Sequence, residues 1–119
     1  FWTVMANFPQ LRYLELWHES KTEALAAGPT QTLRSVEELY LKGVAIDQDL
    51  IEAFAKHLPS LQTLRISRAM IGAAERQALA KMTQTRRMQL DHCENLTAAD
   101  LESLQAALPD CEITAEGIR

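Results

Sequence analysis

Three consecutive residues near the end of the chain, Asp91, His92 and Cys93, are of the types that form nucleophilic catalytic sites. In such sites an acid, a base and a nucleophile must meet side by side so that a proton can pass between them. Here the three residues fall at the end of a predicted strand, where successive side chains point to opposite sides of the sheet. We therefore interpret Cys93 as a small buried residue, and we predict that the chain is not an enzyme and has no catalytic residues.

The three histidines are candidates for metal binding. His18 and His92 occupy matching positions after two predicted strands, but the spacing of strands in a sheet separates them by about 15 Å. A shared metal ion needs bonds of about 2 Å. His57 is predicted to end a helix, where a partial positive charge suits the helix dipole. The sequence also has no glycine-rich phosphate loop, and we predict no metal and no cofactor.

The elements that position these residues repeat along the chain. An apolar pattern recurs at intervals of 25, 25 and 24 residues, as Leu11-x-x-Leu14-x-Leu16, Val36-x-x-Leu39-x-Leu41, Leu61-x-x-Leu64-x-Ile66 and Thr85-x-x-Met88-x-Leu90. The alternation within each copy predicts a short strand. A further small or apolar residue, Val44, Ala69 or Cys93, follows three positions after each of the last three copies. A fixed period of this length is typical of a solenoid, in which each unit buries its apolar face against the next.

Each predicted strand is followed by signals for the start of a helix. Asp47 is placed to cap one helix, and Thr97 with Asp100 and Ser20 with Glu23 have the spacing of a capping box. The predicted helices end at a recurring apolar residue, which a proline follows directly in three cases: Phe8 (Pro9), Leu33, Leu58 (Pro59), Met82 and Leu108 (Pro109).

A strand, a helix and a further strand of the same kind form a parallel βα unit, whose crossover is right-handed in nearly all proteins. Stacked units give an α/β fold with a curved parallel sheet on the concave side and helices on the convex side. The inward side chains then form two ladders, Leu14–Leu39–Leu64–Met88 and Leu16–Leu41–Ile66–Leu90. These ladders predict a core that runs across the whole sheet.

On this leucine pattern the chain resembles the leucine-rich-repeat family, and within it the strand-plus-helix class similar to ribonuclease inhibitor and to many bacterial repeat proteins. The resemblance extends from Phe8 to Ile113 and implies a right-handed solenoid. It gives one domain over residues 1–119: a partial helix (1–10), repeats at about 11–35, 36–60, 61–84 and 85–107, and a closing strand (108–119). In the closing strand we expect Cys111 and Ile113 to point inward, in the register of Met88 and Leu90.

The side chains between the inward ones point to the concave face. The predicted rows are Tyr13, Glu38, Thr63, Arg87; Glu15, Tyr40, Arg65, Gln89; and Trp17, Lys42, Ser67, Asp91. Tyr, Trp and Arg dominate binding hot spots, and this face is predicted to bind a partner protein through Tyr13, Glu15, Trp17, Glu38, Tyr40, Lys42, Arg65 and Arg87. The alternative is a solvated sheet face, on which Tyr40 stacks beneath Arg65 and Glu15 balances charge.

Composition limits the kinds of partner. The 119 residues are 47% hydrophobic and 24% charged, as in a globular protein, and the formal net charge of −4 argues against a nucleic-acid partner. The basic residues between Arg65 and Arg87 are predicted to divide between the strand side and the helix side, so they form no phosphate-binding patch. No apolar run approaches the roughly 18 residues that span a bilayer, and we expect no membrane partner. Two cysteines, Cys93 and Cys111, are too few for a disulfide framework, so a reducing compartment such as the cytoplasm is expected.

Two functions follow as hypotheses. The first is a non-enzymatic module that binds another protein on its concave face. The second is a C-terminal structural or capping segment of a larger repeat protein, such as a bacterial effector acting in the host cytosol or a ligase substrate receptor. Its N-terminal edge, with Trp2, Val4, Met5 and Phe8, would then dock against preceding repeats or self-associate. Size-exclusion chromatography with light scattering separates the two, because a monomer favours the module and concentration-dependent assembly favours the capping segment.

Overall fold

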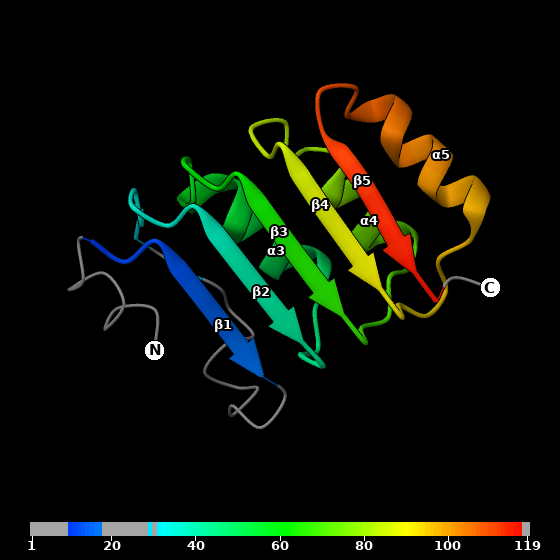
Figure 1. The fold of residues 1–119 in the computed structure, drawn as a ribbon, viewed down its shortest axis with the longest axis horizontal. Helices are drawn as coiled ribbons and strands as arrows, with labels where there is room; N and C mark the ends of the chain where they lie inside the picture. The colour runs from blue at the N-terminus through cyan, green and yellow to red at the C-terminus, as the bar shows by residue number, and fades with distance from the viewer. Residues whose placement is uncertain (1–9, 18–28, 30, 118–119) are drawn as a thin grey trace.

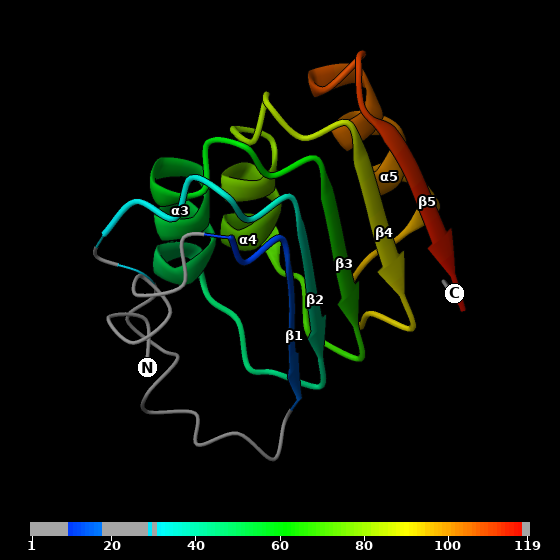
Figure 2. The same cartoon turned by 60° about the vertical axis from the view of Figure 1, so that its left-hand side comes forward.

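The computed structural model describes residues 10–17, 29 and 31–117. Over these ranges the chain forms five strands and three helices, in the order β1 (Tyr13–Trp17), β2 (Glu38–Lys42), α3 (Gln48–His57), β3 (Thr63–Ser67), α4 (Ala73–Leu79), β4 (Arg87–Asp91), α5 (Ala98–Ala107) and β5 (Glu112–Glu116). All strands are parallel, and their order in the sheet is their order in the chain. The three helices lie on the same side of the sheet (Figures 1 and 2). The predicted α/β class with a parallel sheet is confirmed.

The core forms from every second residue of each strand. In β2, Leu39 and Leu41 are each 1% exposed, while the residues between and beside them are exposed or half-buried. The strand register aligns such residues into the two predicted ladders, which are confirmed from β1 to β4. They join one buried cluster with helix residues that include Leu50, Phe54 and Leu104. The core therefore lies between the sheet and the helices.

A repeated hydrogen-bond pattern sets the start of the first four strands. The carbonyl oxygens of Arg12, Glu37 and Gln62 each accept two backbone N–H groups from the next unit, at 2.8 to 3.0 Å. The donors are the residues at and just before the first position of β2, β3 and β4. Because each carbonyl has two lone pairs, one oxygen can hold both donors. This pattern brings adjacent strands into register before their ladders begin.

A second pattern follows directly after strands β2 to β5. Gly43, Arg68, His92 and Gly117 all have positive φ angles, of 67°, 60°, 54° and 70°. The backbone N–H groups of the first three donate to the carbonyl oxygen of the last residue in the next strand, at 2.7, 3.0 and 2.7 Å. This left-handed position was not predicted, because only two of its four residues are glycine. Arg68 and His92 adopt a conformation that is uncommon for residues with a Cβ atom.

The predicted helix starts are confirmed where the structure describes them. The Asp47 side chain accepts a hydrogen bond from the Leu50 N–H at 2.8 Å, and Thr97 and Asp100 form the reciprocal capping box at 3.2 and 3.0 Å. In α4, which had no predicted cap, the Glu75 carboxylate accepts from the Gly72 N–H at 3.0 Å. Ser20, Glu23 and the N-terminal residues Trp2, Val4, Met5 and Phe8 lie outside the described residues.

Two predicted helix ends are wrong. Leu58 and Leu108 do cap α3 and α5, but α4 ends at Leu79 and not at Met82. After Leu79 the chain tightens, because Lys81 and Met82 donate to carbonyls three residues back. Leu33 ends no helix, since residues 31–37 are not helical. It is buried instead in a segment of bend and turn, and its N–H donates to the His57 carbonyl at 2.8 Å.

The predicted register of the closing strand is also wrong. Ile113 pairs with Met88 and Ala115 with Leu90, so β5 is shifted by two residues from the expected alignment. Cys111 is buried but lies before the strand. Its N–H donates to the Leu108 carbonyl in the turn after α5, so it is not available to the β4–β5 ladder. The first strand residue is Glu112, whose N–H donates to the Arg86 carbonyl.

The ladders predict a large loss of stability when a central leucine is shortened. Leu39→Ala and Leu64→Ala should each lower the free energy of unfolding by roughly 2–5 kcal/mol, because both residues are 1% exposed with strands on either side. Urea denaturation followed by circular dichroism measures the change. Leu101→Ala in α5 is the matched control. Because Leu101 is only partly buried, this change should lower the free energy of unfolding by less. Equal losses at all three positions would contradict the ladder.

The left-handed position predicts an unusual order of stabilities at Arg68. Arg68→Gly should leave the free energy of unfolding unchanged or raise it, because glycine adopts φ of 60° without a Cβ clash. Arg68→Val should lower it by about 1–2 kcal/mol, since a β-branched residue resists this conformation. Arg87→Val, at an exposed strand position, controls for loss of the arginine. A valine at residue 68 as stable as the glycine would refute the assignment.

Candidate protein-binding surface

The eight predicted partner-binding residues all lie on strands, at positions that alternate with the core ladders. Tyr13, Glu15 and Trp17 belong to β1, Glu38, Tyr40 and Lys42 to β2, Arg65 to β3 and Arg87 to β4. The register pairs them in the three predicted rows. Because the ladder residues point toward the helices, the residues of this set other than Trp17 point to the other side of the sheet. We call this side the open face, since no described helix lies on it (Figure 2). The Trp17 side chain lies outside what the structure describes.

An aromatic ring and a guanidinium group meet at the centre of the open face. Tyr40 and Arg65 are register partners on β2 and β3, and the Arg65 guanidinium carbon lies 4.5 Å from the centre of the Tyr40 ring. Both residues are half-buried. A cation over a ring at this distance is held by electrostatic attraction of about 0.5–2 kcal/mol. The pair therefore forms a preorganised feature in the middle of the sheet.

The β1 side of the open face combines an aromatic ring with acids. The Tyr13 hydroxyl donates to the Glu15 carboxylate at 3.2 Å, and the Tyr13 side chain is 46% exposed. Desolvation and the adjacent Glu15 carboxylate raise the pKa of Tyr13 above its ordinary value, which keeps its hydroxyl protonated as a donor. Glu38 lies beside Tyr13 in the register. This corner thus offers a partly exposed ring beside two carboxylates.

The β5 side is more acidic than the sequence suggested. Glu112, Thr114 and Glu116 of β5 continue the three rows, in register with Arg87, Gln89 and Asp91. These residues were not among the predicted ones, although a register shift of two residues leaves the facing of alternate side chains unchanged. The 25-residue period, extended from Met88 to Ile113, would have identified them. Arg87 and Glu112 form an ion pair of 3.7 Å, but both side chains are about two-thirds exposed, so it contributes little to stability.

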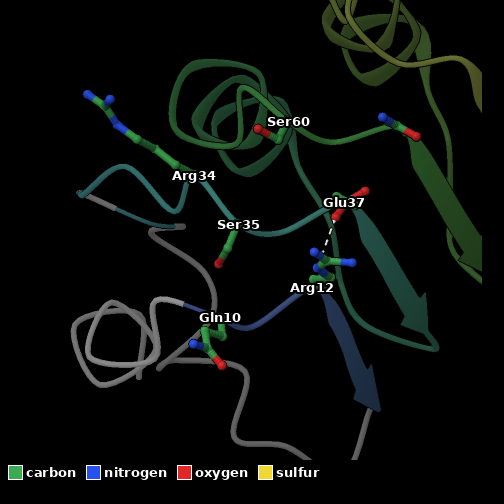
Figure 3. Close-up of a pocket in the computed structure, with 7 residues that line it drawn as sticks. Gln10, Arg12, Arg34, Ser35, Glu37 and Ser60 are labelled. Carbon is green, nitrogen blue, oxygen red and sulfur yellow. Dashed lines mark ion pairs between the residues drawn. The ribbon is translucent and has the colours of Figure 1, made fainter.

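A hollow of about 570 Å³ lies where the first strands begin (Figure 3). It is lined by Gln10, Arg12, Arg34, Ser35, Glu37, Ser60 and Gln62. Its two arginines do not converge: Arg12 pairs with Glu37 at 3.4 Å, while the Arg34 side chain points away from them. Ser35 donates to the Leu11 carbonyl at 2.6 Å. Arg12, Glu37 and Ser35 thus serve the chain's own contacts, and the two arginines are not aimed at a common point.

The candidate catalytic and metal-binding residues near β4 do not converge either. Cys93 is buried, and its Sγ lies 3.6 Å from the Ile66 carbonyl oxygen. Asp91 accepts from Gln89 at 2.7 Å, and His92 lies against Gly117, which has no Cβ atom to meet its ring. The Cys93 thiol faces the backbone carbonyl oxygens of Ile66 and Asp91 instead, at 3.6 and 3.7 Å. In the described part of the chain no three His, Cys, Asp or Glu residues are grouped as metal ligands.

The basic residues divide between the two sides of the molecule, as predicted. Arg65 and Arg87 lie on the open face, whereas Arg76 and Lys81 lie on the helix side and pair with Asp100 at 3.4 Å and Glu52 at 3.3 Å. A strong basic stripe is the usual sign of a nucleic-acid surface, and these four residues are divided between two faces instead. Within the described ranges, no helix is both long and apolar enough to cross a membrane.

No protein-family model, curated protein or solved structure matches this sequence. The resemblance to the leucine-rich-repeat family stays a prediction from the repeat itself.

The environment of Cys93 predicts a slow reaction with alkylating reagents. Burial raises the pKa of the Cys93 thiol, so less of the reactive thiolate is present at a given pH than in an ordinary cysteine. Iodoacetamide at pH 8, with peptide mapping by mass spectrometry, should label Cys93 much faster in urea than in the native chain. Fast native labelling with an apparent pKa below the ordinary value would contradict burial and restore a nucleophilic role.

Proposed function

We propose that the chain is a short leucine-rich-repeat solenoid that binds another protein through its open face and catalyses no reaction. The near-constant period supports the solenoid, because like positions of successive units are paired across one parallel sheet. The helices on one side of the sheet agree with this arrangement (Figure 1). Two unpaired, buried cysteines support a reducing compartment.

The observation that carries the proposal is the Tyr40–Arg65 pair at the centre of the open face. Interfaces obtain most of their binding energy from a few central aromatic and arginine residues, surrounded by contacts that exclude water. Here the pair is central, held in one arrangement, and bordered by polar residues on all neighbouring strands. An exposed sheet face of this kind suits a macromolecular partner more than a small ligand, which prefers an enclosed, largely apolar pocket.

The proposal predicts that loss of the pair abolishes binding with little effect on folding. Tyr40→Ala with Arg65→Ala should lower the free energy of unfolding by no more than about 2 kcal/mol, since both residues are half-buried and outside the core ladders. Affinity capture from an extract of the source cells, quantified by mass spectrometry, should show a partner retained by the wild-type chain and lost by this variant.

A second double variant separates the open face from the rest of the surface. Lys56→Ala with Lys81→Ala removes two exposed charges on the helix side and should retain the partner. Equal capture by the wild type and the Tyr40/Arg65 variant would place the interface elsewhere and overturn the proposal. If the Lys56/Lys81 variant retains the partner and the Tyr40/Arg65 variant loses it, binding depends on the open face and not on general charge attraction.

A further inference from the structure

The basic residues of the open face lie on one diagonal of the sheet. Lys42 ends β2, Arg65 is the middle residue of β3, and Arg87 begins β4. Lys42 pairs with Ser67 and Arg87 with Thr63, so Arg65 is offset from each by one strand and two residues. Diagonal neighbours in a sheet lie about 7–8 Å apart. We call this line of three positive side chains the basic diagonal.

Acidic residues lie on both sides of the basic diagonal and none lies on it. Toward β1 the carboxylates are those of Glu15 and Glu38, and toward β5 they are those of Asp91, Glu112 and Glu116. Between Glu38 and the basic diagonal, the register places uncharged Thr63 and Tyr40. The open face therefore alternates in sign across the sheet. Like charges placed opposite each other cost free energy at an interface, so this pattern disfavours an acidic segment that is shifted sideways.

Arg65 is held ready for an anionic partner. The Tyr40 ring covers one side of its guanidinium at 4.5 Å, and its Nε is buried without a hydrogen-bond partner among the described residues. A guanidinium binds a carboxylate through two parallel N–H donors in a fixed plane, and here these are the donors of the two terminal nitrogens, because Nε is buried. Because the stacked plane is already oriented, little side-chain freedom is lost when a carboxylate binds.

We propose that the basic diagonal binds an extended segment of the partner that carries Asp or Glu at every second position. This inference rests on the proposed function and specifies the chemistry of its partner. In an extended chain, residues i and i+2 lie on one side and about 6.7 Å apart, close to the spacing along the basic diagonal. Successive carboxylates then meet Lys42, Arg65 and Arg87, the last in exchange for its exposed 3.7 Å ion pair with Glu112.

The test is a selection of peptides on the full 119-residue chain. A phage library of random 12-residue peptides is selected on the wild type, and the enriched peptides are measured against three variants. These are the diagonal variant Arg65→Gln with Arg87→Gln, the matched helix-side variant Lys56→Gln with Lys81→Gln, and Tyr40→Ala alone. Enriched peptides should carry alternating acids, lose about tenfold or more in affinity for the diagonal variant and keep their affinity for the helix-side variant.

The alternative outcomes separate this inference from the proposed function. Enriched peptides without acids that lose affinity for Tyr40→Ala would overturn the acidic segment and leave binding by the open face intact. Peptides indifferent to both open-face variants would overturn both. A library that yields no peptide dependent on Arg65 and Arg87 also overturns this inference. Circular dichroism of each variant confirms that a lost affinity does not reflect unfolding.

Discussion

The described structure depends on the stacking of like positions across parallel strands. A five-residue strand has only two or three inward side chains, so it cannot form a core by itself. Each such side chain is buried because its counterpart in the next strand lies about 4.8 Å away. Two hydrogen-bond patterns maintain this alignment. One is made by paired N–H groups before the strands, and the other by left-handed residues after them. Unit length varies mainly after the helices. The helices α3, α4 and α5 begin six, six and seven residues after the preceding strand, whereas the next strand begins six, eight and five residues after each helix ends.

The parts of this fold that repeat could be predicted from the sequence. The ladder through Leu39 and Leu64 follows from the period, and the caps at Asp47 and Thr97 follow from local side-chain chemistry. Helix ends were harder, because the tightened turn before Met82 depends on backbone hydrogen bonds that no residue type specifies. The left-handed conformations of Arg68 and His92 were not predicted for the same reason. The register expected for the closing strand was wrong because it followed the apolar alternation of Cys111 and Ile113. The 25-residue repeat, which pairs Met88 with Ile113, is the better guide.

The open face follows from the same register that forms the core. When Leu39 and Leu41 align with Leu64 and Ile66, the residue between them must align as well, and Tyr40 meets Arg65. The placement of all eight candidate residues could therefore be predicted as soon as the ladders were. Their charge pattern could not, because the register of β5 decides which acids border Arg87 and Gln89. The partner-binding role proposed for these residues depends on their chemistry rather than on alignment, and the Tyr40–Arg65 pair is its main support.

The Arg65 side chain gives a physical reason to prefer a binding face over a solvated one. A surface arginine that only balances charge gains little from an ion pair and is free to keep its donors in water. Arg65 instead has its Nε buried with no hydrogen-bond partner among the described residues, which is unfavourable for the chain alone. The attraction of Tyr40 for the guanidinium offsets part of that cost. On the proposed function, a partner carboxylate binds the terminal nitrogens of this guanidinium, since its Nε is buried. Because the Tyr40 ring already orients the plane, little side-chain freedom is lost on binding, which is the condition expected of a residue that serves recognition.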